Sequence, residues 1–239
     1  MDKPDSTQTL IESLKKEERK EEKKQISEVV KKIYSIVGYD TFMIFGPTGS
    51  GKSSFALWLA HQFAESGLKV WYLDSERNLS RPPKHENIQY IYTPIFNEIY
   101  AYIQNLPKAH LYIIDSIGIP VLAAYSEANM YEKGSMLLKM VTMANYLKIA
   151  TFRNKAMALI INQPVSPYGK EKTSEEDLRP LGSKALFLSK EIWRTYIVDT
   201  NPTRTVCSIK TWRSRKYGRG KELFRIEISD QGVTVKPLI

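Results

Sequence analysis

One short motif constrains the fold of this chain more than any other feature of its sequence. Residues 46–53 read Gly-Pro-Thr-Gly-Ser-Gly-Lys-Ser and match the pattern G-x-x-x-x-G-K-[ST]. The apolar run 41–45 before them is typical of a buried strand, and the run 54–60 after them is typical of a helix. In such a setting, glycines let successive backbone N–H groups face one anion, and the helix N-terminus adds its positive dipole end. The sequence therefore predicts a phosphate-binding loop between a strand and a helix.

The side chains of this loop predict a nucleoside triphosphate, ATP or its product ADP, as the ligand. Lys52 can reach the β- and γ-phosphates and stabilise the charge that moves during transfer, and the Ser53 hydroxyl can complete the coordination shell of Mg²⁺. The residues that we expect to contact the phosphates are Gly46, Pro47, Thr48, Gly49, Ser50, Gly51, Lys52, Ser53 and Ser54.

The composition excludes several classes of protein. The chain has 239 residues, of which 42% are hydrophobic and 26% charged, which suits one α/β domain with or without an appendage. Its one cysteine, Cys207, excludes an internal disulfide framework and suits a reducing cytoplasm. No apolar run approaches the ~18 residues that cross a membrane, and the N-terminus lacks the apolar stretch of a signal peptide. We therefore expect a cytoplasmic protein that does not contact a membrane.

Strand-like and helix-like runs alternate after the phosphate loop. The expected strands are 68–73, 88–92, 111–115 and 156–161, and the expected helices are 96–106 and 131–152. This alternation predicts an α/β fold with a mainly parallel, twisted sheet flanked by helices. The C-terminal part predicts an antiparallel extension of the sheet. Its strand-like runs are 191–199, 203–212, 223–228 and 233–235.

The first part of the chain differs from the rest. Residues 15–24 alternate lysine or arginine with glutamate and predict a solvated helix or arm. Apolar residues then share one helical face and predict a helix that docks on the core or on another subunit. These residues are Ile26, Val29, Val30, Ile33, Ile36 and Val37, and Gly38 follows them as a helix end. We therefore divide the chain into a charged N-terminal helix or arm, 1–37, and a core, 38–239.

Polar side chains close the strands that are expected near the phosphate loop, at the edge where ligands bind in parallel sheets. Asp115 can hold Mg²⁺ from its strand end, and either Asp74 or Glu76 can activate a water for attack on the γ-phosphate. Asn162 and Gln163 end another strand, where an amide can sense the γ-phosphate and pass its presence to the long polar loop that follows. The alternative for these residues is a turn or strand cap, or a surface ion pair.

Together these segments resemble the RecA family, in particular the archaeal RadA paralogues and the KaiC-like ATPases. The matching segments are 46–53, 72–82, 111–116, 160–163, 180–186, 208–216, 223–226 and 230–235. The resemblance spans residues 41–239 and implies a RecA-like P-loop NTPase core that hydrolyses ATP with Mg²⁺. It also implies that Glu76 is the catalytic glutamate, Asp115 the Mg²⁺-binding aspartate and Gln163 the sensor of the γ-phosphate.

The resemblance further implies a nucleic-acid partner. Residues 164–181 match the second DNA-binding loop of the family. In this loop Tyr168 can stack on a base of single-stranded DNA, while Lys170 and Lys172 can neutralise its phosphates. The implied function is a DNA-stimulated ATPase of recombination and repair, associated with the nucleoid and able to work with the main RadA-type recombinase. The alternative is a solvated loop without a nucleic-acid role.

A basic stretch near the C-terminus suggests a contact with an anion. Residues 210–221 contain six basic residues and no acid. By the family resemblance, Lys210 and Arg213, with Arg215 as the alternative, touch a nucleotide bound by the next subunit of a head-to-tail homo-oligomer. No Phe-x-x-Ala motif precedes the core, so the sequence does not predict filaments like those of the main recombinase. A solvated strand and turn is the alternative for the basic stretch.

Two other functions fit the sequence. A KaiC-like regulatory ATPase would act through a protein contact of its N-terminal helix, without nucleic acid. A nucleotide-binding scaffold with little turnover would act as a mediator. Stimulation of ATP hydrolysis by single-stranded DNA separates the DNA-dependent function from the regulatory one. Loss of hydrolysis in Glu76→Gln separates an enzyme from a scaffold.

Overall fold

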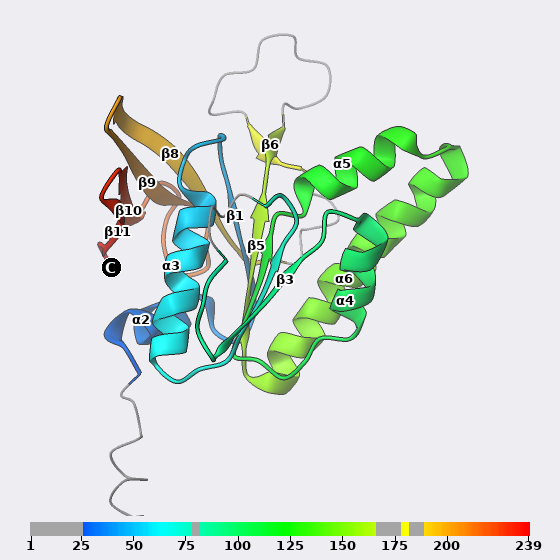
Figure 1. Ribbon diagram of the computed structural model, residues 1–239, viewed down its shortest axis with the longest axis horizontal. Coiled ribbons are helices and arrows are strands. Elements are labelled where there is room, and N and C mark those ends of the chain that lie inside the picture. The colour runs from blue at the N-terminus through cyan, green and yellow to red at the C-terminus, as the bar shows by residue number, and fades with distance from the viewer. Residues whose placement is uncertain (1–25, 78–81, 166–177, 182–188) are drawn as a thin grey trace, which may run out of the picture.

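A nine-stranded sheet carries the fold (Figure 1). The computed structural model describes residues 26–77, 82–165, 178–181 and 189–239. From one edge to the other, the strands follow the order β11-β10-β9-β8-β1-β5-β4-β2-β3. The parallel part consists of β3 (Ile88–Tyr92), β2 (Val70–Asp74), β4 (Leu111–Asp115), β5 (Met157–Asn162), β1 (Thr41–Phe45) and β8 (Glu191–Asn201). The antiparallel part continues with β9 (Arg204–Arg213), β10 (Glu222–Ser229) and β11 (Gly232–Pro237).

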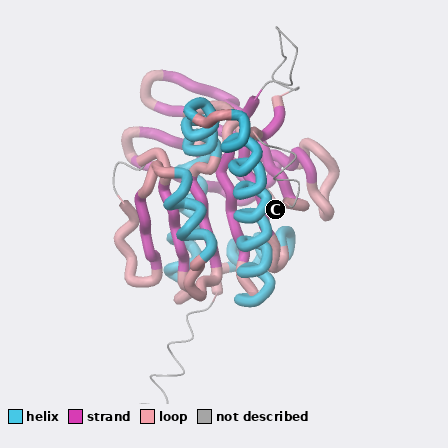
Figure 2. Tube along the Cα trace, turned by 90° about the vertical axis from the view of Figure 1, so that its right-hand side faces the viewer, coloured by secondary structure: helices cyan, strands magenta, loops and turns pink. Residues whose placement is uncertain are grey.

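Helices cover both faces of the parallel part. One side carries α2 (Glu28–Val37) and α3 (Lys52–Glu65), and the other carries α4 (Phe96–Gln104), α5 (Gly118–Glu127) and α6 (Met130–Asn154). Figure 2 shows helices of the second side in front of the strands. Every residue of β1, β2, β4 and β5 is buried, as expected for parallel strands that are covered on both faces. The predicted α/β fold, with its mainly parallel sheet and antiparallel extension, is confirmed.

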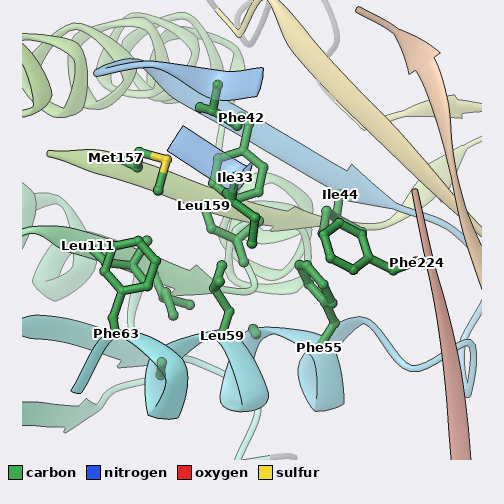
Figure 3. Packing of buried hydrophobic residues seen from close by; sticks show 14 of the residues in the cluster. Ile33, Phe42, Ile44, Phe55, Leu59, Phe63, Leu111, Met157, Leu159 and Phe224 are labelled. Atoms are coloured by element: carbon green, nitrogen blue, oxygen red, sulfur yellow. The ribbon is translucent and has the colours of Figure 1, made fainter. Parts of the chain in front are cut away.

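Helix α3 is anchored to the sheet by aromatic and aliphatic residues spaced four apart. Phe55, Leu59 and Phe63 lie on one face of the helix and are fully buried. Figure 3 shows their side chains pointing toward Leu159 and its neighbours in the sheet. The ring centroid of Phe55 also lies 4.9 Å from that of Phe224 in β10, so the antiparallel part packs against the same helix. This packing fixes the N-terminus of α3 relative to the strand ends.

Helix α2 docks on the core, which is one of the two arrangements predicted. The Ser27 Oγ accepts the N–H of Val30 at 3.3 Å, and Gly38, with a φ of 70°, ends the helix. The buried side chains that join the cluster around α3 are Val30, Ile33, Ile36 and Val37. Ile26, predicted on the same face, precedes the helix and is 40% exposed. The charged part of the predicted helix or arm, 15–24, lies outside the described residues.

Shortening Ile33 to alanine is expected to lower the free energy of unfolding by roughly 2–5 kcal/mol. The side chain is fully buried between α2 and the core, so its removal leaves a cavity. Chemical denaturation of Ile33→Ala measures the difference, with the exposed Lys31→Ala as the control. A loss below about 0.5 kcal/mol, as for an ordinary surface substitution, would contradict the docking of α2 on the core.

Two local features differ from the sequence prediction. Residues 118–127 form α5, which the periodicity does not predict because Gly118 and Pro120 interrupt the pattern of a helix start. The segment 164–180 is predicted as an unpaired loop, but its ends pair as β6 (Pro164–Val165) and β7 (Arg179–Pro180). Among the described helices, none combines the length and the apolar character needed to cross a bilayer.

Candidate nucleotide site

The phosphate loop lies between the end of β1 and the start of α3, as predicted. Gly46, Gly49 and Gly51 adopt positive φ angles of 154°, 76° and 80°. Gly46 also packs against β8, because a Cβ added to it would lie 2.7 Å from the carbonyl oxygen of Thr195. The Oγ1 of Thr195 lies 2.5 Å from the Oγ of Ser50, further along the loop. The neighbouring strand thus fixes the shape of the loop and requires glycine at its first position.

The Lys52 side chain points into this loop. Its Nζ donates hydrogen bonds to the carbonyl oxygens of Gly46 at 2.9 Å and Pro47 at 2.7 Å, and the residue is only 7% exposed. Burial lowers the pKa of Lys52, while the carboxylates of Asp115 and Glu76 act in the opposite direction. A buried ammonium group in a glycine-rich loop at a helix N-terminus is suited to bind a multiply charged phosphate.

Asp115, at the end of β4, faces Ser53 in the first turn of α3. The Ser53 Oγ donates to Asp115 Oδ1 at 3.1 Å, and the Tyr72 hydroxyl donates to Oδ2 at 2.8 Å. Burial raises the pKa of Asp115 to about 6, although the two hydroxyl donors lower it. The described residues contain no group of three or more side chains that could hold a metal ion alone. Because Mg²⁺ prefers oxygen ligands and is often shared with phosphates, Ser53 and Asp115 fit a Mg²⁺ held jointly with a bound nucleotide.

Glu76 lies beyond the end of β2 and meets side chains that follow the adjacent strand β4 and the next strand, β5. Its Oε1 accepts hydrogen bonds from the Ser116 hydroxyl after β4 and, at 3.4 Å, from the Gln163 amide after β5. Because β5, β4 and β2 are adjacent and parallel, their carboxyl ends meet at one edge of the sheet. The structure therefore brings together Glu76, Gln163 and the Asp115 strand end, as the sequence predicts.

Asp74 is the other carboxylate that the sequence suggests for activation of a water, and its surroundings differ from those of Glu76. Its Oδ1 accepts the backbone N–H groups of Glu76 at 3.0 Å and Arg77 at 2.9 Å. Its Oδ2 accepts the Tyr90 hydroxyl at 2.7 Å, and the residue is fully buried. A carboxylate that already accepts three donors inside the fold is not available to a substrate water, so Glu76 is the better candidate for the general base.

Hydrogen bonds at the end of β5 tie the site to the loop that follows. The Asn162 amide donates to the carbonyl oxygen of Leu181 at 2.8 Å, and the Leu181 N–H donates to the Gln163 carbonyl oxygen at 2.9 Å. The residues Tyr168, Lys170 and Lys172, which the sequence assigns to DNA, lie outside the described residues. The described base of the loop is thus directly connected to the residue that contacts Glu76.

Comparisons with known proteins bear on the fold and on the overall sequence. No protein-family model matches the chain. A DNA repair and recombination protein RadB from Methanosphaera stadtmanae is 26% identical over 210 residues, which cover 79% of this chain and 84% of that protein. A crystal structure of the RadB recombinase aligns with a TM-score of 0.58 and 19% identity, covering 83% of this chain and 91% of its own. The fold is RecA-like, and the chain resembles RadB.

The basic residues predicted to contact a neighbouring subunit of this RadB-like chain lie on or after β9. The Lys210 Nζ lies 5.4 Å from the ring centroid of Tyr196, and Arg213 ends the strand in an exposed position. Arg215, the predicted alternative, instead forms an ion pair with Asp40 of the same chain at 2.9 Å. A contact of Lys210 and Arg213 with a second copy stays a prediction.

Three buried or half-buried polar side chains of the sheet have no role in the sequence prediction. Tyr72 and Tyr90 donate to the two buried carboxylates, and Arg194 of β8 is buried with its guanidinium carbon 5.8 Å from the ring centroid of Phe45. Each of them stands within an apolar strand of the sequence. The two tyrosines are therefore interpreted as ordinary core residues and Arg194 as an isolated charge. Only the register of the sheet shows that the two tyrosines reach the carboxylates and that Arg194 lies beside Phe45 at the end of β1.

Proposed function

We propose that this chain is a Mg²⁺-dependent ATPase that acts with DNA in recombination and repair. The observation that supports the proposal is the arrangement at the carboxyl edge of the sheet: Lys52 Nζ lies in the phosphate loop, Ser53 contacts Asp115 at 3.1 Å, and Glu76 contacts Gln163 at 3.4 Å. The name of the Methanosphaera relative, a DNA repair and recombination protein, supports DNA as the partner.

Nucleotide binding follows from the loop and the first turn of α3. The backbone N–H groups of the loop and the Lys52 ammonium hold the β- and γ-phosphates. Gly46 lets the loop pack closely against Thr195 of β8. Ser53 and Asp115 would hold Mg²⁺, which when bound neutralises charge on the phosphate oxygens. Thr48, Gly49, Ser50 and Ser54 complete the predicted contacts with the phosphates.

Hydrolysis requires a base that orients and deprotonates a water in line with the γ-phosphate. Glu76 supplies this carboxylate, and the hydroxyl of Ser116 and the amide of Gln163 hold its Oε1. Lys52 stabilises the negative charge that moves toward the leaving β-phosphate oxygen. In this proposal Gln163 responds to the γ-phosphate; its contact with Glu76 and its position at the start of the loop toward β7 support this role.

The proposed DNA contact is this loop, in which Tyr168 stacks on a base while Lys170 and Lys172 neutralise phosphates. We place the protein in the cytoplasm and, when it is bound to DNA, at the nucleoid. The proposed protein partners are a second copy, whose nucleotide Lys210 and Arg213 would reach, and the main RadA-type recombinase. The likeness to RadB favours this function over the KaiC-like regulatory alternative.

Steady-state ATP hydrolysis with and without single-stranded DNA tests the proposed function. We expect the wild-type rate to rise on adding DNA, and the stimulation to fall steeply between about 50 and 200 mM salt as phosphate contacts weaken. Lys52→Ala should hydrolyse no ATP in either condition, which controls for a contaminating enzyme. If DNA does not change the wild-type rate, the DNA-dependent function is contradicted. The KaiC-like regulatory function would then be the better explanation.

A further inference from the structure

The turn that carries Glu76 is organised around the side chain of Asp74. Glu76 and Arg77 donate their backbone N–H groups to Asp74 Oδ1 at 3.0 and 2.9 Å. This arrangement, in which an aspartate caps the backbone of the next residues, stabilises a tight turn. The direction in which Glu76 leaves the strand is therefore set by the orientation of one buried carboxylate.

Tyr90 fixes that orientation from the neighbouring strand. Its hydroxyl donates to Asp74 Oδ2 at 2.7 Å from β3, the edge strand, in which Tyr90 is paired with Tyr72 of β2. Asp74 is fully buried, so an oxygen left without a donor would lose its hydration without replacement. The Tyr90 hydroxyl thus completes the set of donors and resists rotation of the carboxylate.

The same turn is also held on its other side. Ser75 donates its N–H to the carbonyl oxygen of Asp115 at 2.7 Å and its hydroxyl to the carbonyl oxygen of Ser116 at 2.6 Å. Ser116 in turn donates its hydroxyl to Glu76. Arg77 adopts a φ of 56°, a conformation that a non-glycine residue keeps only where its surroundings fix it. Contacts from β3 and β4 therefore hold the turn from both sides.

We propose that Tyr90 and Asp74 are positioning residues for Glu76: they hold the turn that presents its carboxylate, and they do not touch the nucleotide. This inference rests on the proposed ATPase function, in which Glu76 orients the attacking water. A general base must lie within hydrogen-bond reach of that water, and displacements of about 1 Å lower rates by up to roughly 100-fold. The pair controls catalysis through the backbone of residues 74–77.

The test removes one hydroxyl at a time from β3. Tyr90→Phe keeps the ring and removes the donor to Asp74, and we expect kcat to fall ~10-fold or more while the dissociation constant for ATP stays within about 2-fold. Tyr92→Phe is the matched control, because Tyr92 is two residues further along the same strand and is 45% exposed. Its kcat should equal that of the wild type. An unchanged kcat in Tyr90→Phe, or a parallel loss of ATP affinity, would overturn the proposal.

A second measurement does not depend on catalysis. In Tyr90→Phe the backbone amides of Glu76 and Arg77 should exchange with deuterium at least about 10-fold faster than in the wild type, because their acceptor is no longer held. Exchange of both amides should be unchanged in Tyr92→Phe. Equal exchange in all three proteins would overturn the positioning role. Wild-type protein that hydrolyses no ATP would instead overturn the proposed function, while the amide exchange would still decide whether Tyr90 and Asp74 hold the turn.

Discussion

Replacing Glu76 with glutamine is expected to lower kcat for ATP hydrolysis by roughly 10²–10⁴-fold. Glutamine keeps the size of the side chain and can still face Ser116, but it cannot take a proton from the attacking water. The phosphate loop and Lys52 are unchanged, so the affinity for ATP should stay within about 2-fold of the wild type. Single-turnover hydrolysis and equilibrium binding of ATP, measured on the same protein, separate these two effects.

Glu86→Gln is the control for this substitution. Glu86 is exposed and lies in the connection between β2 and β3, so its loss should change neither rate nor affinity. Hydrolysis by Glu76→Gln at the wild-type rate would remove Glu76 from the mechanism. A joint loss of ATP binding would assign it to the binding of the nucleotide instead.

Asp115→Asn is expected to raise the free energy of unfolding by about 1–3 kcal/mol near neutral pH while Mg²⁺-dependent ATP binding is lost. Burial raises the pKa of Asp115 from 3.8 to about 6, so the folded protein holds the ionised carboxylate at a cost. The neutral amide removes that cost, although it can accept only one of the two hydroxyl donors, Ser53 and Tyr72. The whole shift in pKa, about 3 kcal/mol, is therefore the upper end of the expected gain.

The raised pKa of Asp115 fixes the direction in which its contribution to stability changes with pH. Between pH 3.8 and about 6 the folded protein binds more protons at Asp115 than the unfolded chain does. The contribution of Asp115 to stability therefore falls as the pH rises through this window, and above it the full penalty remains. Urea denaturation at about pH 7.5 and pH 5 should show that the advantage of Asp115→Asn shrinks at the lower pH. Asp199→Asn, at an exposed ion pair, is the control. A less stable Asp115→Asn at the higher pH would contradict this account.

The parts of the site that the sequence predicts are those fixed by local chemistry and by parallel topology. The glycines, Lys52 and Ser53 lie close together in the sequence, and the conformation of their loop is determined largely by these neighbouring residues. The convergence of Glu76 and Gln163 follows because strands of a parallel sheet end at the same edge. Nothing beyond the order of strands is needed to expect these side chains near the phosphates.

The parts that the sequence does not predict depend on register across the sheet. Tyr72 pairs with Tyr90, and Asp74 pairs with Asp115, so each tyrosine hydroxyl reaches a carboxylate on a neighbouring strand. In the sequence both tyrosines read as core residues of apolar strands. Thr195 contacts the phosphate loop only because β8 runs parallel to β1, a pairing that the strand pattern of the C-terminal part does not specify.

Equilibrium binding of ATP by the wild type and by Lys52→Ala tests the central claim most directly. The claim is that the loop, its lysine and the carboxylates at the strand ends form one site for MgATP. The wild type should bind about one ATP per chain with an affinity that rises with Mg²⁺, and Lys52→Ala should bind at least about 30-fold more weakly. Equal affinities of the two proteins, or no effect of Mg²⁺ on the wild type, would contradict the claim.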